Sequence, residues 1–370
     1  MVRFDSLYRF FVFYLLALSF VSGLVSASEG KARIFVVDSY HSEYLWSQAT
    51  HNGMQKCFLE NGYLDNDEQS SDLWEFNFVE TDRAIIQKEW MDTKKKNSFT
   101  QIAKSTHDIS LKIRNFMPDI LLLGDDNAAR YIGAEFLDTD MDIVFWGING
   151  LPLKYGFLDS LENPGHNITG VWQSGYHKES LELLKALVPE ATTYGIVSCD
   201  SETTRPKIKQ LKALESLGDS PLSLNGVVQT NSFSQFKKEV LALAETVDAF
   251  FVLNHDTLMN DEGKHVPMLE VGNWYLSNIR IPETSHEGQF VKEGMLCTAN
   301  DSGYNQGFEA ARIALDILGG NAKAKNTPVI TPKRGPFMVN TQRAKSLDIS
   351  LVDNMDIIEE LVHESAALSQ

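Results

Sequence analysis

Short clusters of polar residues follow four apolar runs of the sequence, and these clusters carry most of the side chains that could bind or transform a ligand. They occupy residues 38–41, 124–127, 198–201 and 254–256. Each apolar run, such as residues 120–123, has the composition of a buried strand. In a parallel α/β sheet the carboxyl ends of the strands lie at one edge, where such sheets bind ligands. The clusters therefore predict a binding site for a small molecule.

Asp125 and Asp126 in the second cluster are adjacent carboxyl groups, a pair that could serve acid–base chemistry or hold a metal ion. An Asp at a helix start also accepts hydrogen bonds from free backbone N–H groups and is favoured by the positive end of the helix. Because the position alone accounts for that role, we favour a helix cap or a hydrogen bond to a ligand over catalysis or metal binding.

The first cluster, followed by Trp46, has the most specific makeup. Backbone N–H groups at a helix start can hold a carboxylate or a similar anion. Tyr40 and Trp46 offer rigid flat surfaces for the apolar body of a ligand, although Trp46 could equally pack in the core. His41 is more typical of a polar side chain lining a cleft than of a metal ligand.

Common catalytic signatures are absent from the sequence. It has no phosphate-binding Gly-rich loop ending in Gly-Lys, no Gly-x-Gly-x-x-Gly, no Gly-x-Ser-x-Gly and no His-Glu-x-x-His. The nine histidines are scattered without the spacing of metal ligands. No pairing of a nucleophile with a base can be read from the sequence. We therefore expect a binding protein rather than an enzyme, with no cofactor and no metal ion.

The composition is that of a globular protein large enough for two domains. The chain has 370 residues, of which 43% are hydrophobic and 22% charged, and a formal net charge of −17. An acidic surface of this kind repels phosphate backbones, which argues against nucleic acid as a partner. Cys57, Cys199 and Cys297 are too few for a disulfide framework, so we interpret them as small buried hydrophobes, with one disulfide as the alternative.

The first 27 residues have the features of an export signal. Arg3 and Arg9 accompany an apolar stretch at residues 10–21, and small residues follow at 25–27. The stretch is short for a membrane span, which needs roughly 20 residues, so an uncleaved anchor is the less favoured alternative. We expect cleavage after Ala27 and a periplasmic or other extracytoplasmic location.

Strands and helices alternate along most of the sequence, which predicts parallel sheets joined by right-handed crossovers. The alternating aromatic residues at 74–78 predict a strand, and residues 83–117 are expected to be mostly helical. Lys94, Lys95 and Lys96 interrupt that segment and are interpreted as a solvated loop or helix end. Residues 355–368 have the spacing of a terminal amphipathic helix.

Three stretches without helical pattern predict that the chain passes three times between two lobes. They lie at residues 162–170, 294–302 and 327–336 and are rich in turn-forming residues. Three passages would form a hinge. The predicted division places residues 32–165 plus 297–326 in the first lobe, places 166–296 plus 327–350 in the second lobe, and leaves 351–370 as a C-terminal tail or helix.

Several short motifs resemble those of the ABC-transporter substrate-binding protein family, whose members have the type I periplasmic-binding fold. They are residues 163–171 (NPGHNITGV), 181–189 (LELLKALVP), 307–312 (GFEAAR) and 317–320 (ILGG), with 339–341 (VNT) and 344–349 (AKSLDI) near the C-terminus. The resemblance covers roughly residues 32–350. It implies an α/β fold of two Rossmann-like lobes with parallel sheets, joined by a three-segment hinge.

In that family the ligand lies between the lobes, at the carboxyl ends of the strands. The resemblance therefore implies these ligand-binding residues: Ser39, Tyr40, Trp46, Asp125, Asp126, Asn127, Asn149, Gln173, Asp200, Asn254, His255 and Thr284. Residues 39–46 depart from the amino-acid-binding members and look more like extracytoplasmic sensor relatives of the same fold.

The function implied by the resemblance is capture of a small organic molecule in the cleft between the lobes for an ABC importer. Its partners would be the small molecule and an ABC permease at the membrane, and the protein is expected to be a monomer. The alternative is a ligand-sensing module that docks on a sensor kinase or a similar signalling receptor.

Overall fold

The computed structural model describes residues 30–369. The predicted signal peptide at residues 1–27 lies outside the described residues. Among the residues that are described, no helix is both long enough and apolar enough to span a membrane. From Ala32 onward the chain forms one compact unit that contains two sheets.

The first sheet has six strands in the order β2-β3-β1-β4-β5-β6, and all neighbours are parallel except β2 and β3. The strands are β1 (Ala32–Asp38), β2 (Phe78–Glu80), β3 (Ala84–Trp90), β4 (Ile120–Gly124), β5 (Asp142–Ile148) and β6 (Ile168–Trp172). Its helices are α2 (Leu45–Glu60), α3 (Asp67–Phe76), α4 (Phe99–Phe116), α5 (Asp125–Asn127), α6 (Gly133–Glu135) and α12 (Gly303–Leu318). A π-helical turn, Ala128–Ile132, joins α5 to α6.

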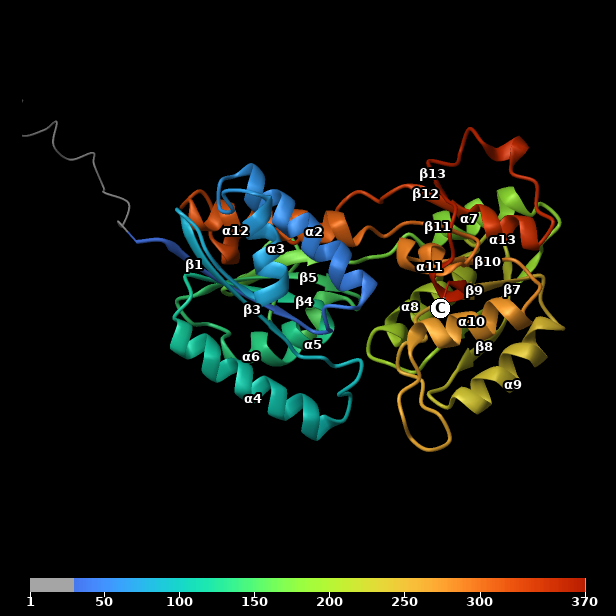
Figure 1. Cartoon of the computed structure of the whole chain (residues 1–370), viewed down its shortest axis with the longest axis horizontal. Coiled ribbons are helices and arrows are strands. Elements are labelled where there is room, and N and C mark those ends of the chain that lie inside the picture. The colour runs from blue at the N-terminus through green and yellow to red at the C-terminus, as the bar shows by residue number, and fades with distance from the viewer. Residues whose placement is uncertain (1–29, 370) are drawn as a thin grey trace, which may run out of the picture. The chain divides into compact units, whose positions relative to one another are not determined.

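Both faces of this sheet are covered, which is why its strands read as continuous apolar runs. Ile34 and Val36 of β1 pack with residues of α2, α3 and α12 on one face. Phe35 and Val37 point the other way and pack with residues of α4 and of the segment after β4. Figure 1 shows α2, α3 and α12 on one side of the sheet and α4 on the other. We call this sheet with its helices the first lobe.

The second sheet has seven strands in the order β13-β12-β11-β10-β9-β7-β8, parallel throughout except for the pair β11 and β12. The strands are β7 (Thr193–Ser198), β8 (Ser223–Gln229), β9 (Ala249–Val252), β10 (Glu283–Ser285), β11 (Cys297–Ala299), β12 (Phe337–Asn340) and β13 (Glu360–Val362). Its helices are α7 (His177–Leu187), α8 (Thr204–Leu217), α9 (Phe233–Ala244), α10 (Met268–Asn278), α11 (Gly288–Glu293) and α13 (Thr341–Ser346). Helices α7 and α8 pack on one face, and α9 and α10 on the other. This is the second lobe.

The chain passes between the lobes at residues 173–176, 300–302 and 331–336. The strands β6 and β11 belong to the lobe opposite to the one in which the predicted division places them. β6 completes the first sheet by pairing with β5, so that sheet extends past residue 165. β11 pairs with β10 and β12 in the second sheet. The chain therefore returns to the first lobe at α12 rather than at residue 297.

Three predicted elements are wrong. Residues 67–76 form α3, which Asn66 caps by accepting a hydrogen bond from the Gln69 backbone N–H, and Phe76 and Phe78 are exposed rather than buried on one face. The segment 83–117 begins with strand β3, and its helix α4 starts only after the Ser98 capping box. The expected terminal helix is replaced by β13, which adds a parallel edge strand to β12, and by short 3-10 turns at Val352–Asn354 and Ala366–Leu368.

The three cysteines are buried and unpaired, as interpreted from the sequence. The prediction of parallel sheets is confirmed, and among the described strands the pairs β2–β3 and β11–β12 are antiparallel exceptions.

Candidate ligand-binding site

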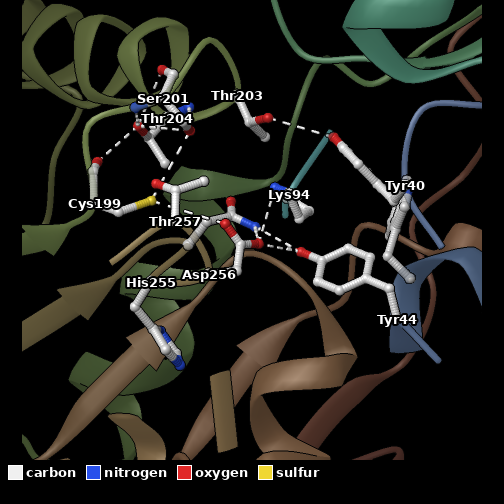
Figure 2. A network of polar contacts seen from close by, with 12 residues as sticks. Tyr40, Tyr44, Lys94, Cys199, Ser201, Thr203, Thr204, His255, Asp256 and Thr257 are labelled. Atoms are coloured by element: carbon white, nitrogen blue, oxygen red, sulfur yellow. Dashed lines mark hydrogen bonds and ion pairs between the residues drawn. The ribbon is translucent and has the colours of Figure 1, made fainter. Parts of the chain in front are cut away.

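Side chains beyond the strand tips of the two lobes contact each other directly. Tyr44, just before α2, donates its hydroxyl to Asp256, which follows β9, at 2.5 Å. The Tyr40 hydroxyl lies 3.3 Å from Thr203 Oγ1 at the start of α8. Figure 2 shows these contacts. The two tip regions therefore form one polar interface.

Asp256 is the centre of this interface. Its Oδ2 lies 2.9 Å from the Lys94 Nζ of the first lobe and also accepts a hydrogen bond from Asn254 Nδ2 at 3.1 Å. Burial alone would raise the pKa of the Asp256 carboxyl, but the Lys94 ammonium and the hydrogen bonds hold that pKa below its ordinary value. The pKa of Lys94 is in turn raised, because Asp256 outweighs the opposing effect of burial. The pair is therefore charged at neutral pH.

Lys94 is placed by a turn that follows β3. Thr93 donates both its backbone N–H and its hydroxyl to the carbonyl oxygen of Ser39, at 2.9 and 2.8 Å. This corrects the interpretation of residues 94–96 as a solvated run. Lys94 is only 3% exposed, whereas the side chains of Lys95 and Lys96 are about half exposed, at 47% and 56%.

On the first lobe, Trp46 donates its indole N–H to Asp125 Oδ1 at 2.9 Å. Asp125 Oδ2 is buried and has no hydrogen-bond partner within residues 30–369. Burial raises the pKa of Asp125 well above its ordinary value, and the neighbouring Asp38 and Asp126 raise it further. Asp126 accepts hydrogen bonds from the Asn149 side chain at 2.8 Å and from the Tyr155 hydroxyl.

The structure does not bear out the helix-cap interpretation of Asp125 and Asp126. Gly124 occupies the N-cap position of α5, and no side chain caps that helix start. Asp125 itself has a left-handed backbone with φ of 66°. Its carboxyl group is directed to Trp46 instead, and its other oxygen is buried without a hydrogen-bond partner among the described residues.

A groove of about 1120 Å³ adjoins the interface where the chain passes between the lobes. Trp46 and the following turns of α2 line it from the first lobe, and Glu287, Gln289 and Asp301 line it from the second lobe and the second passage. Asp301 Oδ2 and Gln289 Oε1 are buried without a hydrogen-bond partner among the described residues. Buried polar atoms are rarely left unpaired in native proteins, so these two acceptors point to a missing donor.

Charges around the groove are unevenly balanced. Glu287 accepts hydrogen bonds from Lys207 at 2.8 Å and Gln173 at 2.9 Å. Burial would raise the pKa of Glu287, but Lys207 and His286 hold it well below its ordinary value. Burial raises the pKa of Asp301 to about 7, an effect that Glu287 reinforces and Lys207 partly offsets. Among the described side chains, no Lys, Arg or His forms a direct ion pair with Asp301.

The structure distributes the predicted site residues over several environments. Tyr40 and Asn254 lie in the interface, and Trp46 lies between the interface and the groove. Gln173 donates a hydrogen bond to Glu287, which lines the groove. Asp125, Asp126 and Asn149 form the adjacent first-lobe cluster.

Five other predicted residues have hydrogen-bond or ion-pair partners away from the interface contacts and the groove. Ser39 binds Gly124 O and the Ala128 N–H and so holds β4 against β1, and Asn127 donates to Thr93. His255 contacts Glu293, and Thr284 donates to Ser180 O inside the second lobe. Figure 2 shows the His255 ring directed away from Asp256. Asp200 is tied to Arg205 and Gln229 at the surface.

Sequence reasoning missed six residues of the candidate site. They are Tyr44, Lys94, Asp256, Glu287, Gln289 and Asp301. Asp256 belongs to a cluster that follows a strand, and Asp301 lies in a predicted passage, so a rule that retains every carboxylate there would have found both. Lys94 gave no signal, because a run of three lysines is typical of solvent-exposed chain.

The model of the family described as ABC transporter substrate binding protein matches residues 87–360. The chain belongs to this family. A curated relative, a tyrosine-binding protein of Clostridioides difficile, is 24% identical over 225 residues, which make up 60% of this chain and 61% of that protein. The match thus spans about three fifths of that relative's length.

Solved structures of the same fold cover most of the chain. A Streptococcus pneumonia ABC domain in complex with L-Trp has a TM-score of 0.70 at 19% identity and covers 90% of this chain and 100% of that one. A conserved domain protein of Vibrio cholerae has a TM-score of 0.70 at 16% identity, with the same coverage. A ligand-free, open substrate-binding protein of Clostridium difficile has a TM-score of 0.64 at 19% identity and covers 90% and 99%. The predicted family and fold are confirmed.

Proposed function

We propose that this protein captures a small organic molecule in the groove between its lobes and delivers it to an ABC permease on the outer side of a membrane. The observation that carries the proposal is the groove itself, which takes its lining from both lobes and contains the buried unpaired acceptors of Asp301 and Gln289. Ligand sites commonly combine apolar walls with a few placed polar groups.

The chemistry of the lining favours a ligand that carries an ammonium group and an aromatic or apolar body. The unpaired atoms of Asp301 and Gln289 are both oxygen acceptors, so they suit a donor. Trp46 offers a flat wall at the first-lobe side of the groove. The relatives whose names mention tyrosine and L-Trp support an aromatic amino acid or a similar amine.

A ligand screen tests binding. Protein freed of endogenous ligand by denaturation and refolding should melt at a higher temperature with one or a few amines or amino acids from a metabolite library. Calorimetry should then give at least about tenfold weaker binding for Trp46→Ala, because an aromatic wall is lost. Trp274→Ala is the matched control, since Trp274 lies in α10 outside the groove and should leave affinity unchanged.

A library that produces no stabilisation, or a Trp46→Ala protein that binds as tightly as the parent, would contradict the proposal. Transport is tested separately by reconstituting ABC permeases of the source organism in liposomes. The liganded protein should raise the ATPase rate of one of them. Tight ligand binding without stimulation of any permease would argue for docking on a signalling receptor instead.

A further inference from the structure

The interface between the strand tips contains a complete site for a cation. Asp256 supplies the carboxylate, and the rings of Tyr40 and Tyr44 flank the position with centroids 4.4 and 5.2 Å from the Lys94 Nζ. Aromatic faces and a carboxylate are the groups with which proteins bind organic ammonium ions. The site combines walls from both lobes, since the tyrosines precede or begin α2 and Asp256 follows β9.

The occupant of this site is the chain's own Lys94. The side chains of Lys94 and Asp256 are only 4% and 3% exposed, so neither charge is solvated. A buried ion pair is maintained only where further hydrogen bonds satisfy it. Tyr44 and Asn254 provide them by donating to Asp256, and Tyr44 also accepts a hydrogen bond from Asn254 at 3.0 Å.

We propose that Lys94 is an internal cation on which the two lobes close, so that it fills a cation-binding site at the strand tips in place of a ligand. The lobes then hold their contact without ligand. The ammonium group of an external ligand is thereby kept away from Asp256. The inference concerns the ligand-free protein and stands independently of the proposed groove ligand.

The test measures the distance between lobes in protein stripped of ligand. Spin labels at Lys104→Cys on α4 and Lys238→Cys on α9 report that distance by double electron–electron resonance, and both positions are exposed. The three native cysteines are buried and should not take up label. The protein with Lys94 should give one narrow distribution. Lys94→Met keeps the length but removes the charge, and it should shift the population to longer distances, with the closed-to-open ratio falling at least about tenfold.

Matched controls separate charge from position and shape. Lys95→Met changes the adjacent exposed lysine and should leave the distribution unchanged. Lys94→Ala should open the lobes, and millimolar n-propylammonium, which replaces the missing part of the side chain, should restore the short distance. Uncharged n-propanol should not restore it. A restoration by n-propanol equal to that by n-propylammonium would overturn the proposal.

Removal of Lys94 alone leaves the Asp256 carboxylate buried without its cation, which can prevent folding. The double variant Lys94→Met with Asp256→Asn removes both charges and avoids that cost. This folded protein should also give the longer distances. A folded Lys94→Met or double variant that keeps the parent distribution would show that the lobes do not close on Lys94.

Discussion

Asp301 is a carboxylic acid whose pKa is raised by burial into the physiological range. Its pKa of about 7 lies far above the ordinary value of 3.8, and it lines the groove on the second passage between the lobes. A folded-state pKa above the unfolded value means that the native protein binds a proton which the unfolded chain releases as pH rises from 4 to 7. The contribution of Asp301 to stability is therefore present below pH 4 and is lost as pH rises through 7.

The same residue has the opposite effect on an ammonium ligand, because only its carboxylate form attracts the cation. Affinity should rise by about tenfold or more between pH 5 and 7.5 and then level off above the pKa of about 7. Asp301→Asn should bind at least about tenfold more weakly at pH 7.5 and lose this pH dependence, yet melt at a higher temperature than the parent at that pH. Calorimetry and thermal denaturation across pH measure both effects. A variant that loses stability and affinity together would assign Asp301 a structural role only.

At the scale of elements, the groove depends on how closely α2 and α12 approach. A Cβ atom on Gly307 of α12 would lie 1.8 Å from the Thr50 carbonyl oxygen, and one on Gly53 of α2 would lie 1.9 Å from the Tyr304 carbonyl oxygen. Only glycine permits this contact between two backbones. The start of α12 also packs behind Trp46, because a Cβ on Gly303 would lie 3.1 Å from the indole ring. The helix pair therefore sets the position of the Trp46 wall.

Gly307→Ala should push α12 away from α2 and lower the free energy of unfolding by about 1–3 kcal/mol. Ligand affinity should fall as well, since Trp46 moves with α2. Gly319→Ala is the matched control, because the added Cβ meets no atom closer than 3.3 Å and should change stability little. Chemical denaturation measures the free energies. Equal stability of the two variants would contradict the close-contact explanation.

The sequence predicts elements well where burial is complete and poorly where it is partial. Strands such as β4 and β9 read as apolar runs because helices cover both faces of their sheets. The region of α3 and the short β2 is predicted wrongly as one strand, because the exposed Phe76 and Phe78 give the alternating pattern of a strand with one buried face. The strand β13 has three half-buried residues, and its pairing with β12 depends on contacts far along the chain.

The residues of the candidate site were likewise predictable where they adjoin fully buried strands. Trp46, Asp125, Asp126 and Asn149 could be predicted because all lie just beyond buried strands or at the start of the following helix, where topology alone places them. The ion pair of Lys94 with Asp256 could not be predicted, because Asp256 belongs to the other lobe. Only the arrangement of the two lobes brings the two side chains together. Pairings across an interface between lobes leave no local pattern in the sequence.

At the scale of the whole molecule, the contact between the lobes contains a buried ion pair and should respond to acid. Asp256 has a folded-state pKa below the ordinary value of 3.8, because Lys94 and the hydrogen bonds of Tyr44 and Asn254 outweigh burial. Its contribution to stability is therefore fully present above the unfolded value of about 3.8 and is lost as pH falls through the lower folded value. The exposed pair of Arg130 and Glu202 also joins the lobes but should add little, as surface ion pairs do.

Acid should therefore separate the lobes before it unfolds them. In the ligand-free protein with labels at positions 104 and 238, the short distance should persist from pH 7 to 5 and give way to longer distances only below the ordinary Asp256 pKa of 3.8. Circular dichroism in the far ultraviolet should still report folded lobes at the start of that change. Asp256→Asn removes the titrating group, so its long distances should be present already at pH 6 and should not change with acid. Separation of the parent lobes at pH 5 to 6 would assign the contact to a group other than Asp256, because a carboxyl group whose pKa is lowered in the folded state cannot take up a proton there.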